Sequence, residues 1–139
     1  MSARILYRII AVLLLAFAGG HQFGFRRADP RWNATGVVDG MRNVTFGVQG
    51  FTRSYWDFFS GFGFFVTAFL VFAAIHSWQM GAMSTERLSA LPVMRWSFAA
   101  CFAIIAVISW QDFFVTPGVL STLIALGLVA AAMLGASTR

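Results

Sequence analysis

Four long hydrophobic runs divide the chain and alternate with shorter polar segments. The runs cover residues 5–25, 55–79, 91–110 and 117–136. Each run contains about 20 residues or more, and a helix of that length crosses the roughly 30 Å hydrocarbon layer of a bilayer. The pattern therefore predicts an all-α fold, an integral membrane four-helix bundle that forms a single membrane domain over residues 1–139.

The longest polar segment, residues 26–54, joins the first two runs. It is too charged to span a membrane and too long to be a tight turn. Five apolar residues recur in it at helical spacing: Val37, Met41, Val44, Val48 and Phe51. This spacing predicts a short helix lying at the membrane interface, although three glycines in the same stretch weaken that prediction.

The second run has two different faces. An aromatic stripe is formed by Phe58, Phe62, Phe65, Phe69 and Phe72, with His76 at its end. A stripe of small residues is formed by Ser60, Gly63, Thr67 and Ala74. We expect the small residues to face neighbouring helices and the phenylalanines to touch lipid or the core; the sharper interpretation is that the phenylalanines wall an apolar ligand cavity.

Small residues also recur at every fourth position in two other runs. The two sets are Ala16, Gly20 and Gly24 in the first run and Gly127, Ala131 and Gly135 in the last. Such spacing lets another helix approach closely in lipid, so we expect both helices to pack through these stripes.

Composition supports a membrane protein of bacterial type. Hydrophobic residues make up 59% of the chain and charged residues 11%, whereas soluble domains are about 25% charged. Ten arginines, no lysine and five acidic residues give a net charge of +5, and in so apolar a chain these charges mark helix ends near anionic headgroups. Membrane lipids are therefore expected partners, and nucleic acid is not.

The N-terminal charges bear on localisation. Arg4 and Arg8 precede the first run like the basic part of a signal sequence, and Ala16-Phe17-Ala18 is similar to a signal-peptidase site. A cleaved signal peptide is thus the competing interpretation, but the apolar run continues past that site. Because the arginines divide five to five between the two sides, the signal-like start alone favours a multi-pass inner-membrane protein with both termini in the cytoplasm.

Alternation of the four spans places the end of the first, the start of the second and the 111–116 connection on one side of the membrane. This side is the predicted ligand-binding site, with the residues His21, Arg53, Tyr55, Trp56, Asp57, Phe58, Phe62, Phe65 and Asp112. His21, Asp57 and Asp112 are the candidate catalytic residues, because a histidine with two carboxylates can bind a polar head or move protons. The structural alternative is a set of ion pairs that pin the helix ends, such as Arg53 with Asp57 four residues on.

The histidines do not favour a cofactor. His21 and His76 end consecutive antiparallel helices, so they lie on opposite sides of the membrane and a haem between them is disfavoured. The usual spacing of His and Cys metal ligands is also missing from the sequence. We expect no cofactor and no metal, and a single ion held by His21, Asp57 and Asp112 is the alternative that stays open.

Three segments carry a resemblance to a known group of proteins: Gly20-His21 with Gly24-Phe25, Asp29-Pro30-x-Trp32, and Phe51-x-Arg53-x-Tyr55-Trp56-Asp57-Phe58-Phe59-x-Gly61-Phe62-Gly63. Together they resemble a family of small bacterial four-helix integral membrane proteins to which no activity has been assigned. The chain is more distantly similar to the membrane bundles of the DoxX type and of the sterol-isomerase type. The resemblance implies a fold and no activity.

Two functions fit these observations. The first is the binding of a small hydrophobic or lipid-like molecule at the predicted ligand-binding site, with or without chemical alteration of that molecule. The second is an accessory or assembly subunit without catalytic activity, which docks onto copies of itself or onto a larger membrane complex. An ion-coupled pump and a passive channel are disfavoured, because the middles of the spans carry no ionisable residue and no polar stripe.

Overall fold

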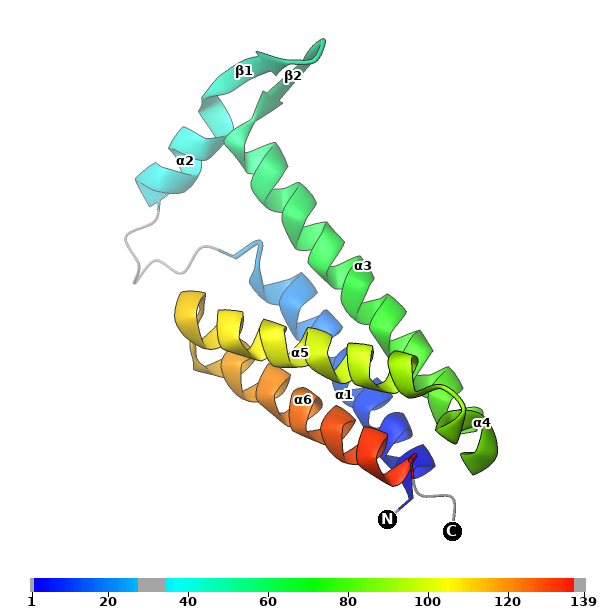
Figure 1. Ribbon diagram of the computed structural model, residues 1–139. Helices are drawn as coiled ribbons and strands as arrows, with labels where there is room; N and C mark the ends of the chain where they lie inside the picture. Colours follow the sequence, from blue (N-terminus) through cyan, green and yellow to red (C-terminus); the bar gives the residue numbers. More distant parts are fainter. Residues whose placement is uncertain (1, 28–34, 137–139) are drawn as a thin grey trace. The chain divides into compact units, whose positions relative to one another are not determined.

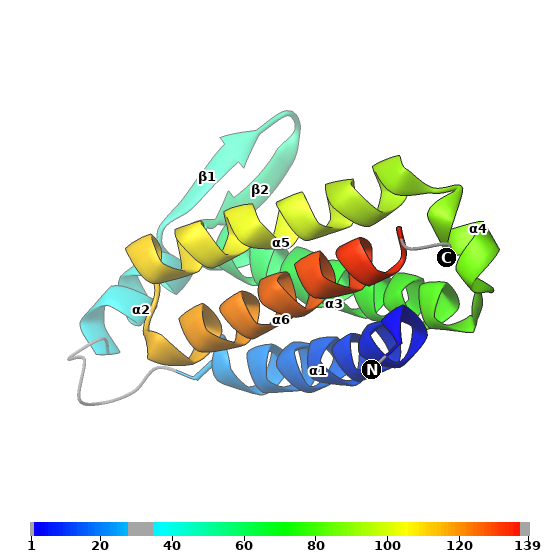
Figure 2. The ribbon, with the colours of Figure 1, turned by 60° about the horizontal axis from the view of Figure 1, so that its bottom comes forward.

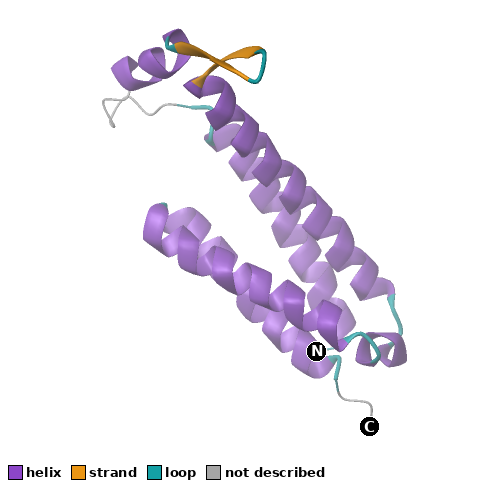
Figure 3. Ribbon diagram, turned by 45° about the horizontal axis from the view of Figure 1, so that its top comes forward, coloured by secondary structure: helices purple, strands orange, loops and turns teal. Residues whose placement is uncertain are grey.

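The computed structural model describes residues 2–27 and 35–136, and its elements follow in chain order in Figure 1. They are α1 (Ala3–Gly24), α2 (Thr35–Asn43), β1 (Thr45–Val48), β2 (Phe51–Ser54), α3 (Tyr55–Ala82), α4 (Thr85–Ser89), α5 (Pro92–Asp112) and α6 (Val115–Leu134). Helix dominates the described residues (Figure 3).

Four of these helices, α1, α3, α5 and α6, are long and apolar enough to cross a membrane. Their bounds agree with the four predicted spans to within three residues at each end. The agreement has a physical basis, because a backbone in hydrocarbon must satisfy its own hydrogen bonds and a long apolar run does so as a helix. The prediction of four helices that are long and apolar enough to span a membrane is therefore confirmed.

The prediction of an all-α fold is wrong in the segment before α3. The expected interfacial helix is present only as α2, and residues 45–54 form an antiparallel hairpin in which Thr45 pairs with Ser54 and Val48 with Phe51. Gln49 and Gly50 make the two-residue turn, with φ angles of 48° and 84°. Positive φ at both positions matches the turn whose twist suits a hairpin, and this turn stops a helix from continuing through the segment.

The chain forms two compact units, each of which contains part of α1 and part of α3. Unit 1 comprises residues 1–17 and 70–139, and unit 2 comprises residues 18–69. The predicted domain over residues 1–139 therefore contains both units.

Unit 1 is a packed helical bundle in which α5 and α6 run side by side (Figure 2). Its fully buried side chains include Tyr7, Leu14, Phe102 and Leu128. The Ser77 hydroxyl of α3 donates a hydrogen bond of 2.7 Å to the Tyr7 carbonyl of α1, so a polar contact supplements the apolar packing. Between helices in lipid, close packing and such hydrogen bonds hold the bundle together.

The two stripes of small residues behave differently. On α6, Ala131 is fully buried, and a Cβ added at Gly127 would lie 3.3 Å from the Ile10 side chain, so this stripe packs as predicted. On α1, Ala16, Gly20 and Gly24 are exposed. The prediction that α1 packs through that stripe is wrong.

Candidate functional site

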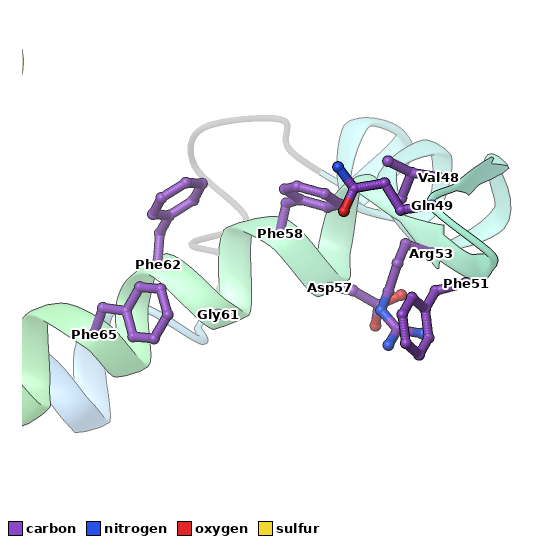
Figure 4. A pocket seen from close by; sticks show the side chains of 9 residues that line it. All are labelled: Val48, Gln49, Phe51, Arg53, Asp57, Phe58, Gly61, Phe62 and Phe65. Carbon is purple, nitrogen blue, oxygen red and sulfur yellow. The ribbon is translucent and has the colours of Figure 1, made fainter.

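An open groove of about 470 Å³ lies in unit 2, between the hairpin and the first turns of α3. It is lined by Val48, Gln49, Phe51, Arg53, Asp57, Phe58, Gly61, Phe62 and Phe65. Figure 4 shows Phe58, Phe62 and Phe65 projecting from α3, with Gln49, Phe51 and Arg53 coming from the hairpin. Five of the predicted ligand-binding residues line this groove: Arg53, Asp57, Phe58, Phe62 and Phe65.

The apolar wall of the groove is the first part of the aromatic stripe of α3. Phe58, Phe62 and Phe65 are spaced by four and three residues, so they share one face of the helix. Phe62 is 64% exposed and Phe65 is 72% exposed. Aromatic side chains this open on a membrane helix need a partner from outside the described chain, either lipid, ligand or protein.

The opposite face of α3 packs against α1, as the stripe of small residues predicts. A Cβ added at Gly63 would lie 2.3 Å from the Phe25 ring, so only glycine leaves room for that ring. Phe25 also contacts Phe64 edge-on, with ring centroids 5.7 Å apart, and it stacks on His21 at 5.0 Å. The packed face holds α3 in place, and the groove face stays open.

The polar end of the groove is built around Arg53. This residue lies on β2, where Nη1 donates a hydrogen bond of 2.8 Å to the Thr52 carbonyl and the guanidinium carbon sits 4.9 Å from the centre of the Phe51 ring. Guanidinium carries five N–H donors, and the Thr52 carbonyl is the only hydrogen-bond partner of the Arg53 guanidinium in the part of the chain that the structure describes. Arg53 therefore keeps donors for an anionic or acceptor-rich group.

Asp57 caps the start of α3. Its Oδ2 accepts hydrogen bonds from the Ser54 backbone N–H at 2.8 Å and from the Ser54 hydroxyl at 3.0 Å. The Ser54 Oγ in turn accepts from the Asp57 backbone N–H at 3.2 Å. This reciprocal pattern is a capping box, so the carboxylate is already engaged in capping the N-terminus of the helix.

The predicted pairing of Arg53 with Asp57 on one helical face is wrong. That pairing requires both residues to be helical, but α3 begins at Tyr55 and Arg53 belongs to β2. Asp57 is bound to Ser54 instead, and Arg53 to the Thr52 carbonyl.

His21 belongs to a different polar group, formed with Thr67 of α3. Its Nδ1 lies 3.0 Å from the Thr67 hydroxyl, and that hydroxyl is 3.0 Å from Gln22 Oε1 and 3.2 Å from the Gly63 carbonyl. The latter two atoms only accept, and a Thr67 hydroxyl that donates to one of them would accept from His21 Nδ1–H. We expect this arrangement to favour the tautomer whose Nε2 carries the lone pair.

Tyr55 and Trp56 do not line the groove. The Tyr55 ring packs on Phe46 of β1, with centroids 5.0 Å apart. The Trp56 ring lies 5.4 Å from Phe59 and 4.5 Å from the guanidinium of Arg42 at the end of α2. These two aromatic residues attach the hairpin and α2 to the first turn of α3.

His21 and Asp57, two of the three candidate catalytic residues, are not brought together. Thr67, the partner of His21, and Asp57 are ten positions apart on α3, which is about 15 Å along the helix axis. Asp112 is the last residue of α5 and belongs to unit 1. Within residues 2–27 and 35–136, no group of three or more His, Cys, Asp or Glu side chains is placed to hold a metal ion.

Sequence reasoning missed the hairpin side of the groove, namely Val48, Gln49 and Phe51, and it missed Thr67 and Gln22 as partners of His21. A signal for the hairpin is present in the sequence, because Gln49-Gly50 separates two short stretches that suit β-strands. The partners of His21 depend on how α1 faces α3, which no local pattern specifies. The Asp29-Pro30-x-Trp32 segment of the resemblance falls in residues 28–34, outside the described residues.

Comparisons with known proteins add no functional assignment to this geometry. No protein-family model, no curated protein and no solved structure matches the chain.

Proposed function

We propose that the groove of unit 2 binds a small amphiphilic, lipid-like molecule. The apolar part of the ligand lies along Phe58, Phe62 and Phe65, and its polar head lies at Arg53 and Gln49. The observation that carries the proposal is the composition of the groove, which joins an exposed aromatic wall to an arginine whose guanidinium donates no hydrogen bond to a carboxylate among the described residues. Ligand sites in proteins commonly combine such an apolar lining with a few polar groups.

The chemistry of Arg53 indicates the class of head group. A guanidinium binds carboxylates and phosphates through paired N–H donors, and its hydrogen bonds to charged acceptors are stronger than those between neutral groups. Gln49 adds an amide that both donates and accepts. The expected ligand is therefore an amphiphile with an anionic or acceptor-rich head.

The groove supports binding more than chemical turnover. Asp57, the one carboxylate that lines it, is occupied by Ser54, and His21 does not line it. Catalysis would need an acid or base free to reach the ligand. We therefore propose that the protein binds its ligand, and the proposal does not include chemical processing of that ligand.

Native mass spectrometry after extraction in mild detergent tests this function. The wild-type protein should retain a defined lipid-like molecule, and Arg53→Gln and Phe62→Ala should each lose most of it. Arg27→Gln is the matched control, because Arg27 is an exposed arginine of unit 2 that does not line the groove. Equal retention by Arg53→Gln and Arg27→Gln would reject the groove as the binding site.

A second candidate, the accessory or assembly subunit, rests on the exposure of α3. Only 17% of its most apolar window is buried, the lowest share among the four candidate spans. A helix this open can dock onto a second copy of the chain or onto a larger membrane complex. A stoichiometric complex without bound lipid in the same experiment would favour this function over ligand binding.

Orientation in the inner membrane is part of the proposal. With the termini in the cytoplasm, the groove opens near the periplasmic surface. A cysteine at the hairpin turn, introduced as Gln49→Cys after Cys101→Ala, should react in intact cells with a reagent that does not cross the inner membrane. Labelling only after the cells are broken would indicate the opposite orientation, with the hairpin turn in the cytoplasm.

A further inference from the structure

A polar cluster joins α1 and α3 within unit 2, on the face of α3 opposite the groove. Its centre is the Thr67 hydroxyl, which lies 3.0 Å from His21 Nδ1 and 3.0 Å from Gln22 Oε1. All three side chains are only partly buried. Polar side chains between helices in lipid serve as links, and these distances show that the cluster is such a link. Its depth along α3 and its unpaired nitrogens indicate a binding role as well.

Two pairs of tryptophan and arginine mark the ends of α3. The Arg42 guanidinium lies 4.5 Å from the centre of the Trp56 ring. The Arg8 guanidinium lies 5.3 Å from the centre of the Trp78 ring. Such pairs are typical of the headgroup level of a membrane. Thr67 is eleven residues from each tryptophan, about 16 Å along the helix, and half of the hydrocarbon layer is about 15 Å. When α3 crosses a bilayer, the cluster is therefore near the middle of that layer.

This depth differs from the one that the sequence indicates for His21. Because His21 is three residues from the end of α1, the alternation of spans predicts it at the membrane surface, beside the start of α3. The end of α1 instead meets α3 at Gly63, where the Phe25 ring fills the space of the missing side chain. A polar, ionisable side chain inside the hydrocarbon layer is costly and marks a candidate functional site.

Two nitrogens of the cluster have no hydrogen-bond partner among the described residues. They are His21 Nε2 and Gln22 Nε2, and a single carbon atom separates each from the atom that contacts the Thr67 hydroxyl. Neither nitrogen is closed off from the surface. In the described part of the chain, the buried side-chain nitrogens and oxygens that lack a partner are the Tyr7 hydroxyl and Arg95 Nε. A molecule in the surrounding lipid can therefore reach both nitrogens of the cluster.

The chemistry of the two nitrogens defines the group that suits them. When His21 Nδ1–H donates to the Thr67 hydroxyl, His21 Nε2 accepts, and the Gln22 amide nitrogen donates. A hydroxyl group both donates and accepts, so it satisfies the two nitrogens together. A carboxylate or phosphate only accepts, and it would bring a charge into the hydrocarbon layer. The Phe25 ring, stacked 5.0 Å from the imidazole, adds apolar surface beside the site.

We propose that His21 and Gln22 form a binding site for the hydroxyl group of a neutral, membrane-soluble molecule. The ligand O–H donates to His21 Nε2, and its oxygen accepts from Gln22 Nε2–H. Thr67 is a positioning residue, because its hydroxyl holds both side chains. Isoprenoid alcohols and quinols both carry this chemistry. The site and the groove lie on opposite faces of α3, so this proposal does not rest on the proposed function.

NMR of the histidine ring nitrogens tests the site, because the chain contains only two histidines, His21 and His76. The purified protein in neutral detergent is titrated with farnesol and with a short-chain quinol kept in its reduced form. The methyl ethers of both compounds are the controls, because they lack the O–H donor. A hydroxyl compound that binds should shift the His21 Nε2 resonance saturably, whereas its ether should not. The His76 resonances should not change.

Three variants locate the response. Gln22→Leu should weaken the binding on the order of fivefold, the effect of losing one hydrogen bond. Gln79→Leu is the matched control, because Gln79 is an exposed glutamine of α3 in unit 1. Arg53→Gln should leave the response unchanged, because Arg53 lines the groove.

The outcomes distinguish the source of the hydroxyl group and can overturn the proposal. A response to farnesol alone identifies an isoprenoid alcohol, and a response to the quinol alone identifies a quinol. A response to both identifies the hydroxyl group itself as the recognised feature. The proposal is overturned if neither compound shifts the His21 resonance, if the ethers shift it equally, or if Arg53→Gln abolishes the response. Equal binding by Gln22→Leu and Gln79→Leu would also overturn it.

Discussion

The packed face of α3 in unit 1 and the groove face of α3 in unit 2 differ sharply in their surroundings. Ala73, Ala74 and Ser77 in unit 1 are at most 3% exposed, whereas Phe62 and Phe65 in unit 2 are more than 60% exposed. One continuous helix thus presents a packed face in unit 1 and an open aromatic wall in unit 2, and its outward residues in unit 1, such as Phe72, are exposed as well. Small side chains admit a neighbouring helix, and bulky ones keep it away.

This difference suggests that the residues that determine stability and the residues that bind the ligand lie in different units of the chain. Unit 1 contains the largest fully buried side chains, including Phe102, Leu14 and Tyr7. Unit 2 contains the groove, and its α3 is fixed by a glycine contact, a capping box and one polar link to α1. We therefore expect substitutions in unit 1 to change mainly the free energy of unfolding, and substitutions on the groove face to change mainly ligand binding.

The largest predicted effect compares two phenylalanines. Phe102→Ala should lower the free energy of unfolding by about 3–5 kcal/mol, because it removes a fully buried ring and leaves a cavity. Phe65→Ala should change it by less than about 0.5 kcal/mol, because that ring is 72% exposed. Unfolding in mixed micelles with increasing dodecyl sulfate measures both. Equal losses would remove the distinction between the units.

The next effect concerns two glycines of α3. Gly63→Ala should cost about 1–2 kcal/mol, because its Cβ would displace the Phe25 ring. Gly61→Ala should be neutral or stabilising by up to about 1 kcal/mol, since a Cβ there meets no described atom within 4 Å and alanine favours helix. The same unfolding assay measures both, with NMR of the His21 ring reporting loss of the Phe25 stack. A Gly63→Ala variant with an unchanged free energy of unfolding would mean that the Phe25 ring is not held against Gly63 and His21.

A smaller effect tests the capping box. Ser54→Ala should cost about 1 kcal/mol, because it removes the Ser54 hydroxyl from its bonds with the Asp57 carboxylate and backbone N–H. Ser60→Ala on the same helix should be close to neutral. Circular dichroism during thermal unfolding follows both variants. If Asp57→Asn removed ligand while leaving stability unchanged, Asp57 would act in binding instead of capping.

The smallest predicted effect breaks the polar link between α1 and α3. Thr67→Val should cost about 0.6 kcal/mol, a typical value for a hydrogen bond between membrane helices, because His21 and Gln22 lose their shared partner. The exposed Thr52→Val, whose side chain is not part of this link, is the control. A change of the His21 tautomer detected by NMR in Thr67→Val would confirm the hydrogen-bond direction. An unchanged tautomer would contradict it.

The sequence predicted the spans because apolar length alone determines which segments can cross a bilayer. It predicted the packed Gly127 and Ala131 stripe but wrongly expected the same of Gly20 and Gly24. Spacing of small residues shows that a close approach is sterically allowed, and it does not show that a neighbouring helix is present. The tertiary arrangement decides that point.

The candidate site was only partly predictable for a similar reason. The phenylalanine face follows from helical periodicity, and three of its five phenylalanines, Phe58, Phe62 and Phe65, line the groove. The role of Asp57 depends on where α3 begins, and the hairpin before α3 sets that start. The helical spacing of Val44, Val48 and Phe51 predicted a helix in this segment, so the Gln49-Gly50 turn of the hairpin was not expected. Because α3 begins at Tyr55, Asp57 caps the helix and does not form the predicted ion pair with Arg53.

Photo-crosslinking from the two units tests the central claim most directly. A benzoylphenylalanine at Phe62 should form one defined adduct with a lipid-like molecule in native membranes, and Arg53→Gln should abolish that adduct. The same probe at Leu126, an exposed residue of α6 in unit 1, should give only a heterogeneous mixture of bulk lipid. Identical mixtures at both positions, unaffected by Arg53→Gln, would contradict a ligand groove in unit 2.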